Sequence, residues 1–552
     1  MIASRFEHGE KTYLAFLDAR RAYDRVWRDG VLHRLMEYGV RGKMLQMLAS
    51  MLRSNTRTVM VQGAQSAAFN TVVGLPQGAV LSPLLYALFI NPLVARLQRA
   101  NLGIWMGDIR VSVLLYADDI VLVAPDAAQL QRMLNITSEF ASQYQFRFNT
   151  KQGKSDVVVS PQPDAEDRRT AFKLGDGALH LSPEYKYLGV EMGALGVRGK
   201  TGWDSYIQRI AEKANNCSQM LGHSVCGRSP LHMSTAVSLF KVLVRPVLEY
   251  ANGIWAGLCT KGNWRLLESV QARFGRRVLQ LQPSIAGTYV RRELGLQSLK
   301  ERGDIAMLRY FGKLCGMDKE RLAARVFRFR CETVDKTDHA QYSWCRAASE
   351  ALRLYGFEDE WFARSVDQET WGLAVKRAVR PAFAAAEDTR MQGRPSLAVF
   401  CQLGAGAKGW LDHPLNHAGE ALRFRFRCGG APLMQLVGQK SGDLVCRMCD
   451  SGEVESAQHF ACHCANYEDQ RQECLQEVLE LLAGHDVPEL RMAVRFREPR
   501  LFLGDALPGK LSTELRRKVD RVLCDFLKVA WRRRSTQWEA LCVPGTKGWR
   551  LR

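Results

Sequence analysis

Short hydrophobic runs alternate with longer stretches of helical spacing over the first 160 residues. Thr12–Asp18 is an apolar run that ends in an acid, and two further runs within residues 114–123 flank a central Ala-Asp-Asp. Apolar runs of this length are typical of buried strands, whereas the spacing over 127–143 is typical of a helix. A last apolar run is Asp156–Ser160. The pattern therefore predicts a strand, a helix, a hairpin with acids at its tip, a helix and a strand, in that order.

Further elements are expected between the first strand and the hairpin that carries the acids. Gly and Pro mark a loop there, and a Ser-Pro pair precedes a stretch of helical spacing. Such a pair is typical of a helix start, where Ser caps the first amides and Pro has no amide to lose. The elements predicted are a helix over 19–27, a helix and a hairpin (Thr56–Gln62 with Ala68–Val73) within 43–73, a stiff loop over 74–78, and a helix with Ser82 as N-cap and Pro83 at its first position.

This order is that of the split βαβ, ferredoxin-like sheet, if residues 43–73 are counted as an insertion. The topology places the end of the first strand beside the hairpin, so Asp18 can meet Asp118 and Asp119. Adjacent carboxylates between buried strands repel each other, and hard oxygen ligands suit Mg²⁺. Three of them can hold two ions about 3.5–4 Å apart, as in polymerases and nucleases. The alternatives are a solvated turn for the Asp pair and a helix N-terminal acid for Asp18.

Composition narrows the class of protein. The chain has 552 residues, 47% of them hydrophobic, so it is long enough for several domains with real cores. Its net charge of +20 points to a polyanionic partner, and residues 491–552 hold half of the surplus, with 16 Lys or Arg against 6 Asp or Glu. The 15 Cys without a secretory leader indicate a reducing, intracellular compartment. No apolar run reaches membrane-spanning length, so no membrane partner is expected.

A second constellation of candidate ligands lies near the C-terminus, with the pattern Cys446-x2-Cys449-x9-His459-x4-Cys464. Thiolates and an imidazole at such spacing can close a tetrahedral structural zinc site. Scattered core cysteines are the alternative, because the Cys-x2-Cys spacing is not exclusive to metal sites. The neighbours that leave the fourth ligand open are Cys462, His463 and Cys474.

Helices and basic segments are expected in the rest of the C-terminal half. Residues 330–420 are rich in Ala and Arg and are predicted to be helical. Leu422–Arg427 interleaves Arg with aromatic rings, which predicts either phosphate pairing with base stacking or an edge strand with one basic face. From Ser512, an apolar stripe predicts a helix with a solvated or nucleic-acid-binding basic face. The stripe is Leu515, Val519, Val522, Phe526 and Ala530, and the basic residues largely off it are Arg516, Arg517, Arg532, Arg533 and Arg534.

Several motifs together resemble the reverse transcriptases of non-LTR (LINE-type) retrotransposons. The order and spacing of that family's polymerase motifs are matched by Phe-Leu-Asp-Ala-Arg-Arg-Ala-Tyr-Asp-Arg-Val-Trp (16–27), Gly-Leu-Pro-Gln-Gly-Ala-Val-Leu-Ser-Pro (74–83) and Tyr-Ala-Asp-Asp (116–119). The resemblance extends over nearly the whole chain and is strongest over 13–190. Later segments that resemble the family's palm, primer grip and thumb are Phe148-Asn149 with Gly153-Lys154-Ser155, Tyr185–Gly189, Val244–Tyr250 and Glu293-Leu294-Gly295.

The resemblance implies catalytic and substrate-binding roles. Asp18, Asp118 and Asp119 would bind two Mg²⁺ ions that activate the primer 3′ hydroxyl and steady the leaving pyrophosphate. Tyr23 matches the aromatic residue that crowds the sugar 2′ position and so prefers deoxynucleotides, with a core tyrosine as the alternative.

Three more sites follow from the same resemblance. Lys154 matches a palm lysine proposed to reach the triphosphate or to protonate pyrophosphate, and Lys151 is its rival because the interval before it looks stretched. The resemblance also favours Cys464 as the fourth ligand of one structural Zn²⁺. The loop against the incoming nucleotide and template is matched by Pro76, Gln77 and Gly78, and the primer grip by Tyr187, Leu188 and Gly189.

The implied architecture is α+β, a right-hand polymerase palm with partial fingers, a helical thumb and a small C-terminal zinc-binding region. The implied partners are an RNA template, a DNA primer or target and dNTP, and the implied location is the nucleus. The expected domains are residues 1–195 (palm with partial fingers), 196–330 (thumb), 331–420 (helical connector) and 421–552 (zinc knuckle and basic nucleic-acid-binding region).

Two other functions are open. One is an RNA-directed RNA polymerase, because such palms also pair two aspartates with an acid near Asp18, here Asp24. The other is a catalytically inactive nucleic-acid-binding remnant. Only 17 residues precede Asp18, where the family has a fingers region that clamps the triphosphate. We therefore expect an N-terminally truncated chain that binds RNA and primer–template but polymerises poorly alone. Neither an endonuclease nor a ribonuclease H pattern is visible in the sequence.

Overall fold

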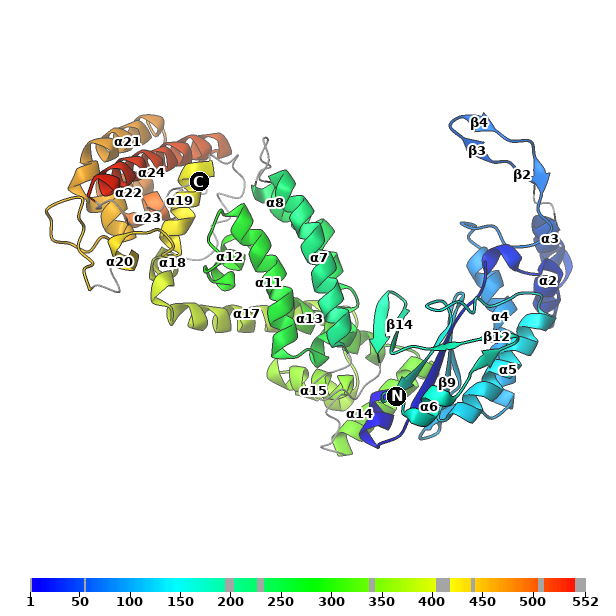
Figure 1. Ribbon diagram of the computed structural model, residues 1–552. Helices are drawn as coiled ribbons and strands as arrows, with labels where there is room; N and C mark the ends of the chain where they lie inside the picture. Colours follow the sequence, from blue (N-terminus) through cyan, green and yellow to red (C-terminus); the bar gives the residue numbers. More distant parts are fainter. Residues whose placement is uncertain are drawn as a thin grey trace. The chain divides into compact units, whose positions relative to one another are not determined.

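The computed structural model describes residues 2–53, 56–193, 203–225, 233–336, 343–403, 417–437, 442–504 and 511–541 (Figure 1). The chain divides into two compact units, each made from separate stretches of sequence. The first contains residues 1–207, 257–260 and 310–369, and the second contains residues 208–256, 261–309 and 370–552. The domain boundary expected at 195/196 lies outside the described residues.

A five-stranded sheet is the centre of the first unit. Its strands, in spatial order, are β13 (His180–Leu181), β10 (Asp156–Ser160), β1 (Thr12–Asp18), β9 (Asp119–Ala124) and β8 (Val113–Tyr116). The central strand β1 is antiparallel to both β9 and β10, and β8 continues into β9 as a hairpin. Apart from β13, this is the order of the split βαβ sheet. The predicted α+β palm sheet is therefore confirmed.

Both faces of this sheet are covered, which explains the unbroken apolar runs of its strands. Every residue of β10 is buried, and so is every residue of β1 and β9 except the acid that ends or begins the strand. On one face lie α4 (Ser82–Arg99) and α5 (Ala127–Gln143). On the other face, Val326 and Phe329 of α14 (Leu322–Lys336) pack against a smaller apolar cluster. Helices on both faces leave the acids at the strand ends as the exposed part of these strands.

Shorter elements complete the first unit. The predicted insertion is present as a helix followed by a hairpin, and its strands are shorter than the sequence suggests. The remaining elements are α1 (Ile2–Glu7), α2 (Arg28–Glu37), α3 (Gly42–Arg53), β2 (Thr56–Arg57) paired with β5 (Phe69–Asn70), β3 (Met60–Val61) with β4 (Ala64–Gln65), β6 (Ile104–Met106) with β7 (Ile109–Val111), α6 (Ala165–Arg169), β11 (Lys173–Leu174) with β12 (Gly177–Ala178), β14 (Glu184–Tyr187) with β15 (Val190–Gly193), α15 (Trp344–Leu354) and α16 (Glu358–Ala363).

Two predicted helix starts are wrong. Residues 19–27 form only a 3-10 turn at Tyr23–Arg25, because the chain first continues beside the sheet and the Arg20 amide donates to the Arg147 carbonyl. α4 begins at Ser82, not at Pro83, and makes no side-chain cap. The Ser82 hydroxyl instead donates to the Pro76 carbonyl at 2.6 Å, so it holds the preceding loop.

Helices make up most of the second unit. The described part of residues 330–420, which is divided between the two units, is mostly helical as predicted. The helix predicted from Ser512 is also present. The elements are α7 (Asp204–Val225), α8 (Met233–Leu239), a π-helical turn (Phe240–Val244), α9 (Arg245–Glu249), α10 (Asn252–Trp255), α11 (Lys261–Val278), α12 (Gly287–Glu293), α13 (Leu299–Cys315), α17 (Trp371–Gln392), α18 (Ala398–Leu403), α19 (His417–Arg427), α20 (Met434–Val437), α21 (Glu468–Leu481), α22 (Pro488–Arg495), α23 (Pro499–Leu503) and α24 (Thr513–Leu541). The first residues of α7 and the last residues of α13 belong to the first unit.

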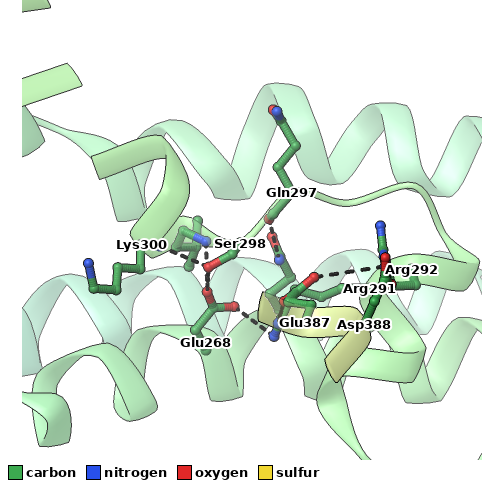
Figure 2. Close-up of polar contacts among 10 residues, drawn as sticks. Glu268, Arg291, Arg292, Gln297, Ser298, Lys300, Glu387 and Asp388 are labelled. Carbon is green, nitrogen blue, oxygen red and sulfur yellow. Dashed lines mark hydrogen bonds and ion pairs between the residues drawn. The ribbon is translucent and has the colours of Figure 1, made fainter. Parts of the chain in front are cut away.

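A polar network ties together helices of the second unit (Figure 2). Glu268 of α11 accepts hydrogen bonds from the Ser298 hydroxyl and the Leu299 amide, both at 2.7 Å. The same carboxylate pairs with Arg291 of α12 at 3.2 Å, and Arg291 pairs in turn with Glu387 of α17. Glu268 therefore caps the start of α13 and links it to α12 and α17.

Both predictions for the Arg- and Phe-rich segment around Arg425 are wrong, because it is the end of helix α19. Arg423 and Arg427 are 1% exposed, so they cannot pair with phosphates. Arg423 pairs with Asp520 at 2.6 Å, and Arg427 pairs with Glu293. A buried charge needs such a partner, and these partners lie far away in the sequence.

The apolar stripe of α24 faces the core as predicted, with Val522 only half-buried. The basic residues off that stripe differ from one another. Arg517, Arg532 and Arg533 are exposed, whereas Arg534 is buried and pairs with Glu455 through two hydrogen bonds of 2.6 and 2.8 Å. The predicted basic face therefore excludes Arg534. No helix among the described residues is long and apolar enough to cross a membrane.

Candidate functional site

The acids of the hairpin lie at its tip. Tyr116 and Asp119 are register partners, so Ala117 and Asp118 form a two-residue turn between β8 and β9. Ala117 has a φ of 53°, which is unusual for a residue with a side chain and costs conformational energy. The turn contains neither Gly nor Asn, the residues that adopt a positive φ most easily. Its conformation is therefore consistent with a constraint on the position of Asp118. Asp119 is the first residue of β9, directly before five buried ones.

Asp18 lies beside this tip. It ends β1 and is the register partner of Asp119 on the neighbouring strand. Its amide donates to Ser155 Oγ at 3.0 Å, and its carbonyl accepts the Asn149 amide at 2.9 Å. The backbone that carries the carboxylate is therefore fixed from both sides. The structure thus brings Asp18, Asp118 and Asp119 to one end of the sheet.

The charges of the three acids act on one another at Asp119. Partial burial raises the pKa of Asp119, and the nearby charges of Asp118 and Asp18 raise it further. Lys154 opposes that shift, with its Nζ 3.8 Å from Asp18 Oδ2. Oxygen donors that repel one another in this way fit a hard divalent cation. Among the described residues, their ligand atoms are not all within 4.8 Å of one another, in contrast to those of the Cys and His cluster below.

Lys154 is the lysine that reaches the acids. Its side chain is 58% exposed and leaves a turn in which its own amide donates to the Lys151 carbonyl at 3.0 Å. The Gly153 amide donates to Asp156 Oδ2 at 3.0 Å, which fixes the turn to the start of β10. The long interval between Asn149 and Lys154 in the sequence therefore forms a compact turn. Lys151 is exposed on the same turn.

Tyr23 lies at the edge of the core, as its alternative assignment predicts. Its half-buried ring stacks on Tyr86 with a centroid distance of 4.9 Å and packs against the core. Tyr86 is buried on α4, and its pKa is raised by burial and by the charge of Asp118. Tyr23 thus packs on a tyrosine whose pKa responds to Asp118, and its role at a nucleotide site stays a prediction.

The loop at residues 74–78 is held from several sides. The Gly74 amide donates to Val26 O and the Leu75 amide to Tyr23 O, so the loop runs beside the chain that follows β1. Gly74 has a φ of 85°, and a Cβ there would lie 2.6 Å from the Asp24 carbonyl, so the position requires glycine. Gln77 Nε2 donates to Asp24 Oδ1 at 3.2 Å. Pro76 and Gly78 lie on either side of Gln77.

Arg28 is a residue that the sequence reasoning missed. Its guanidinium is buried and donates to the carbonyls of Thr71, Val73 and Gly74. These contacts join the end of the insertion hairpin to the loop. No local signal distinguishes this arginine from the exposed ones beside it, because its acceptors are backbone carbonyls more than 40 residues away.

The hairpin β14–β15 carries the predicted primer-grip residues. Tyr187 and Val190 are register partners, so Leu188 and Gly189 form a two-residue turn. Their φ angles are 48° and 79°, as in the hairpin turns that match the twist of the strands. Gly189 has no side chain to strain, whereas Leu188 is exposed on the turn. The turn therefore presents one apolar side chain to solvent.

The Cys and His cluster is gathered as a metal site requires. The ligand atoms of Cys446, Cys449, His459 and Cys464 all lie within 4.8 Å of one another, with 3.4 Å between Cys449 Sγ and His459 Nε2. Cys462 and Cys474 are buried elsewhere in the same core. These donors, three thiols and an imidazole, fit Zn²⁺. Glu453, which the sequence reasoning missed, lies 2.6 Å from His459 Nδ1 and can orient the ring, as carboxylates commonly do for zinc-bound histidines.

Comparisons with known proteins agree with this geometry. Residues 2–192 match the family model described as "Reverse transcriptase (RNA-dependent DNA polymerase)". The chain is 25% identical to "RNA-directed DNA polymerase from mobile element jockey" of Drosophila funebris, a match that covers 48% of this chain and 28% of that protein. It is also 25% identical to "Probable RNA-directed DNA polymerase from transposon BS" of Drosophila melanogaster, over 57% of this chain and 34% of that protein.

The matched part spans about a third of the length of these curated relatives. Among solved structures, a telomerase from Candida tropicalis in complex with a fragment of telomeric RNA is 12% identical and covers 59% of this chain and 52% of that one, with a TM-score of 0.27. That score is too low to support an argument about fold or function. The family match and the named relatives are the comparisons that bear on function. Residues 2–192 thus match the reverse transcriptase family, and the chain is similar to proteins named as RNA-directed DNA polymerases of mobile elements.

Proposed function

We propose that this chain is an RNA-directed DNA polymerase of a non-LTR retrotransposon, which adds deoxynucleotides to a primer 3′ hydroxyl on an RNA template. One observation carries the proposal. Asp18 and Asp119 are register partners on adjacent strands, and Asp118 sits on the turn directly beside them. Three carboxylates at one end of a palm sheet are the arrangement that two-metal nucleotidyl transfer needs. The family match over the same residues supports the reading.

Asp18, Asp118 and Asp119 would hold two Mg²⁺ ions. When bound, these supply Lewis-acid activation of the primer hydroxyl and charge stabilisation for the leaving pyrophosphate. Lys154 adds positive charge next to Asp18, where it can meet a triphosphate oxygen. Tyr23, which stacks on Tyr86, would crowd a ribose 2′ hydroxyl. No side chain has to act as a covalent nucleophile, because positioning and charge stabilisation suffice for phosphoryl transfer.

The remaining sites would bind nucleic acid. Pro76, Gln77 and Gly78 would line the incoming nucleotide and template, and the turn of Leu188 and Gly189 would seat the primer end. Exposed arginines of α24 add sequence-independent phosphate contacts in the second unit. Binding of RNA and of primer–template should therefore weaken as salt rises. A nuclear site of action, where a chromosomal target lies, belongs to the same proposal.

Cys446, Cys449, His459 and Cys464 would hold one structural Zn²⁺. Glu453 supports that assignment because its carboxylate lies against the histidine nitrogen that faces away from the thiols. A closed four-ligand site of this kind contributes folding energy and leaves no open position for catalysis. We therefore propose a structural role for zinc in the second unit.

A primer-extension assay tests the proposal. The full chain, in excess over an RNA template with a DNA primer, is supplied with Mg²⁺ and either deoxynucleotides or ribonucleotides. We expect deoxynucleotide incorporation, even if slow. Preferential ribonucleotide incorporation would favour an RNA-directed RNA polymerase, and salt-sensitive binding without any incorporation would favour a non-catalytic remnant.

A further inference from the structure

The primer-grip hairpin of this chain is packed on the strand that carries Asp18. The ring of Tyr185, in β14, stacks on Phe16 with a centroid distance of 4.4 Å and an interplanar angle of 12°. Phe16 lies two residues before Asp18 on β1. Tyr187 also contacts Phe16, with a centroid distance of 5.7 Å. The position of the hairpin is therefore fixed relative to the acids by aromatic packing.

The hydroxyl of Tyr185 adds a polar link to the lysine turn. It donates a hydrogen bond of 2.6 Å to the carbonyl of Lys154, the residue whose Nζ lies 3.8 Å from Asp18 Oδ2. Burial raises the pKa of Tyr185 to about 12, and the charges of Asp18 and Asp119 contribute. The hydroxyl therefore keeps its proton at neutral pH and remains a donor.

The other side of the lysine turn is anchored as well. Asp156 is 2% exposed, and its Oδ2 accepts hydrogen bonds from the Gly153 amide at 3.0 Å and from the Ser182 hydroxyl at 2.8 Å. Next to Lys154, Ser155 Oγ accepts the amide of Asp18. Asp156 and Ser155 thus bind the turn to the sheet. The bond from Tyr185 joins the turn to the hairpin.

We propose that Tyr185 is a positioning residue that ties the Lys154 turn to the primer-grip hairpin, so that seating the primer end on Leu188 and Gly189 also sets the lysine at the nucleotide. The inference deepens the proposed polymerase function and rests on it. A Tyr hydroxyl suits this role because it can release the carbonyl without disturbing the ring stack. Movement of the hairpin, as the primer advances, would then be felt at Lys154.

Tyr185→Phe tests the proposal, because it removes the hydroxyl and keeps the stacking ring. A hydrogen bond of this kind contributes enough for kcat/KM for dNTP to fall about three- to tenfold in single-nucleotide incorporation. The primer–template Kd should stay unchanged. In a Lys154→Ala background, Tyr185→Phe should change kcat/KM less than about twofold, since both variants disturb one element. Equal losses in both backgrounds would overturn the proposal.

Tyr13→Phe is the matched control. Tyr13 is also a tyrosine of the first unit, and its hydroxyl bonds to Asp167, away from the lysine turn. Tyr13→Phe should lose at least as much stability as Tyr185→Phe, because its bond is buried and meets a carboxylate, but without any coupling to Lys154. Hydrogen exchange supplies a readout that needs no turnover, with exchange over residues 151–156 expected to accelerate in Tyr185→Phe and not in Tyr13→Phe. If Tyr185→Phe left exchange over residues 151–156 unchanged, the proposal would be overturned, even if the chain proved inactive. If the wild type were inactive but Tyr185→Phe still accelerated exchange there, only the polymerase function would be contradicted.

Discussion

Replacing Arg427 with Met should destabilise the second unit by about 4 kcal/mol at pH 7. The guanidinium of Arg427 is 1% exposed and pairs with both carboxylate oxygens of Glu293, whose side chain is 0% exposed. It also donates to the Leu503 carbonyl at 2.7 Å. Loss of one partner of a buried ion pair typically costs about 3–5 kcal/mol, because the other charge is left without compensation.

Protonation of Glu293 limits this cost and makes it depend on pH. Burial already raises the pKa of Glu293, and the charge of Arg427 opposes that shift. Without Arg427, the folded protein should bind a proton at Glu293 that the unfolded chain releases above a pKa of about 4.3. That uptake costs about 3.7 kcal/mol at pH 7 and about 1 kcal/mol at pH 5. The deficit of the variant should therefore shrink by up to about 2–3 kcal/mol between pH 7 and pH 5, less whatever the wild type itself gains from its raised Glu293 pKa.

Native-state hydrogen exchange of α19 peptides, corrected for the intrinsic rate at each pH, measures the free energy of opening. Arg425→Met is the control, since this neighbour on the same helix is partly exposed and its side chain donates only to the Gln280 carbonyl among the described hydrogen bonds. It should cost less than about 1 kcal/mol. The double variant Arg427→Met/Glu293→Gln should lose the pH dependence. If Arg427→Met costs no more than the control, or shows no pH dependence, the argument from burial is wrong.

Other expectations can be checked separately. Tyr23→Ala should admit ribonucleotides in primer extension, and unchanged sugar discrimination would leave Tyr23 a core residue only. Purified protein should contain about one Zn²⁺ per chain, the loading of one four-ligand site. The Cys446→Ser variant should lose this zinc and unfold around residues 446–464, while the palm stays folded. Wild-type protein without zinc would refute the site. Burial raises the pKa of Glu420 to about 8 despite nearby Arg423, so stability should fall by up to about 1.4 kcal/mol per pH unit between about pH 5 and 8. Glu420→Gln should remove that slope in urea titrations, and a slope equal to wild type would contradict the assignment.

The palm could be predicted from sequence because its signals are local. Strands buried on both faces give unbroken apolar runs, and β1, α5 and β10 have the bounds that the pattern predicts. The meeting of Asp18 with the hairpin acids followed from topology, since the split βαβ order allows one place for the end of the first strand.

The failures among the charged residues share a physical cause: the environment of a charged side chain is set by its partner and not by its neighbours in sequence. Arg427 lies in a stretch that alternates like a basic strand, yet it is buried because Glu293 neutralises it 134 residues away. Arg28 and Arg534 are further cases, held by backbone carbonyls and by Glu455. Nothing in the local pattern marks Tyr185 either, since its acceptor is a carbonyl 31 residues earlier.

The most direct test of the central claim compares the wild-type chain with Asp18→Ala and Asp118→Ala in single-turnover incorporation of one deoxynucleotide opposite RNA. With Mg²⁺, the wild type should extend the primer and both variants should lose extension almost completely. Their Kd for primer–template should stay close to wild type, because the phosphate contacts lie elsewhere. Extension by either variant at the wild-type rate would contradict the assignment of these acids as the catalytic site.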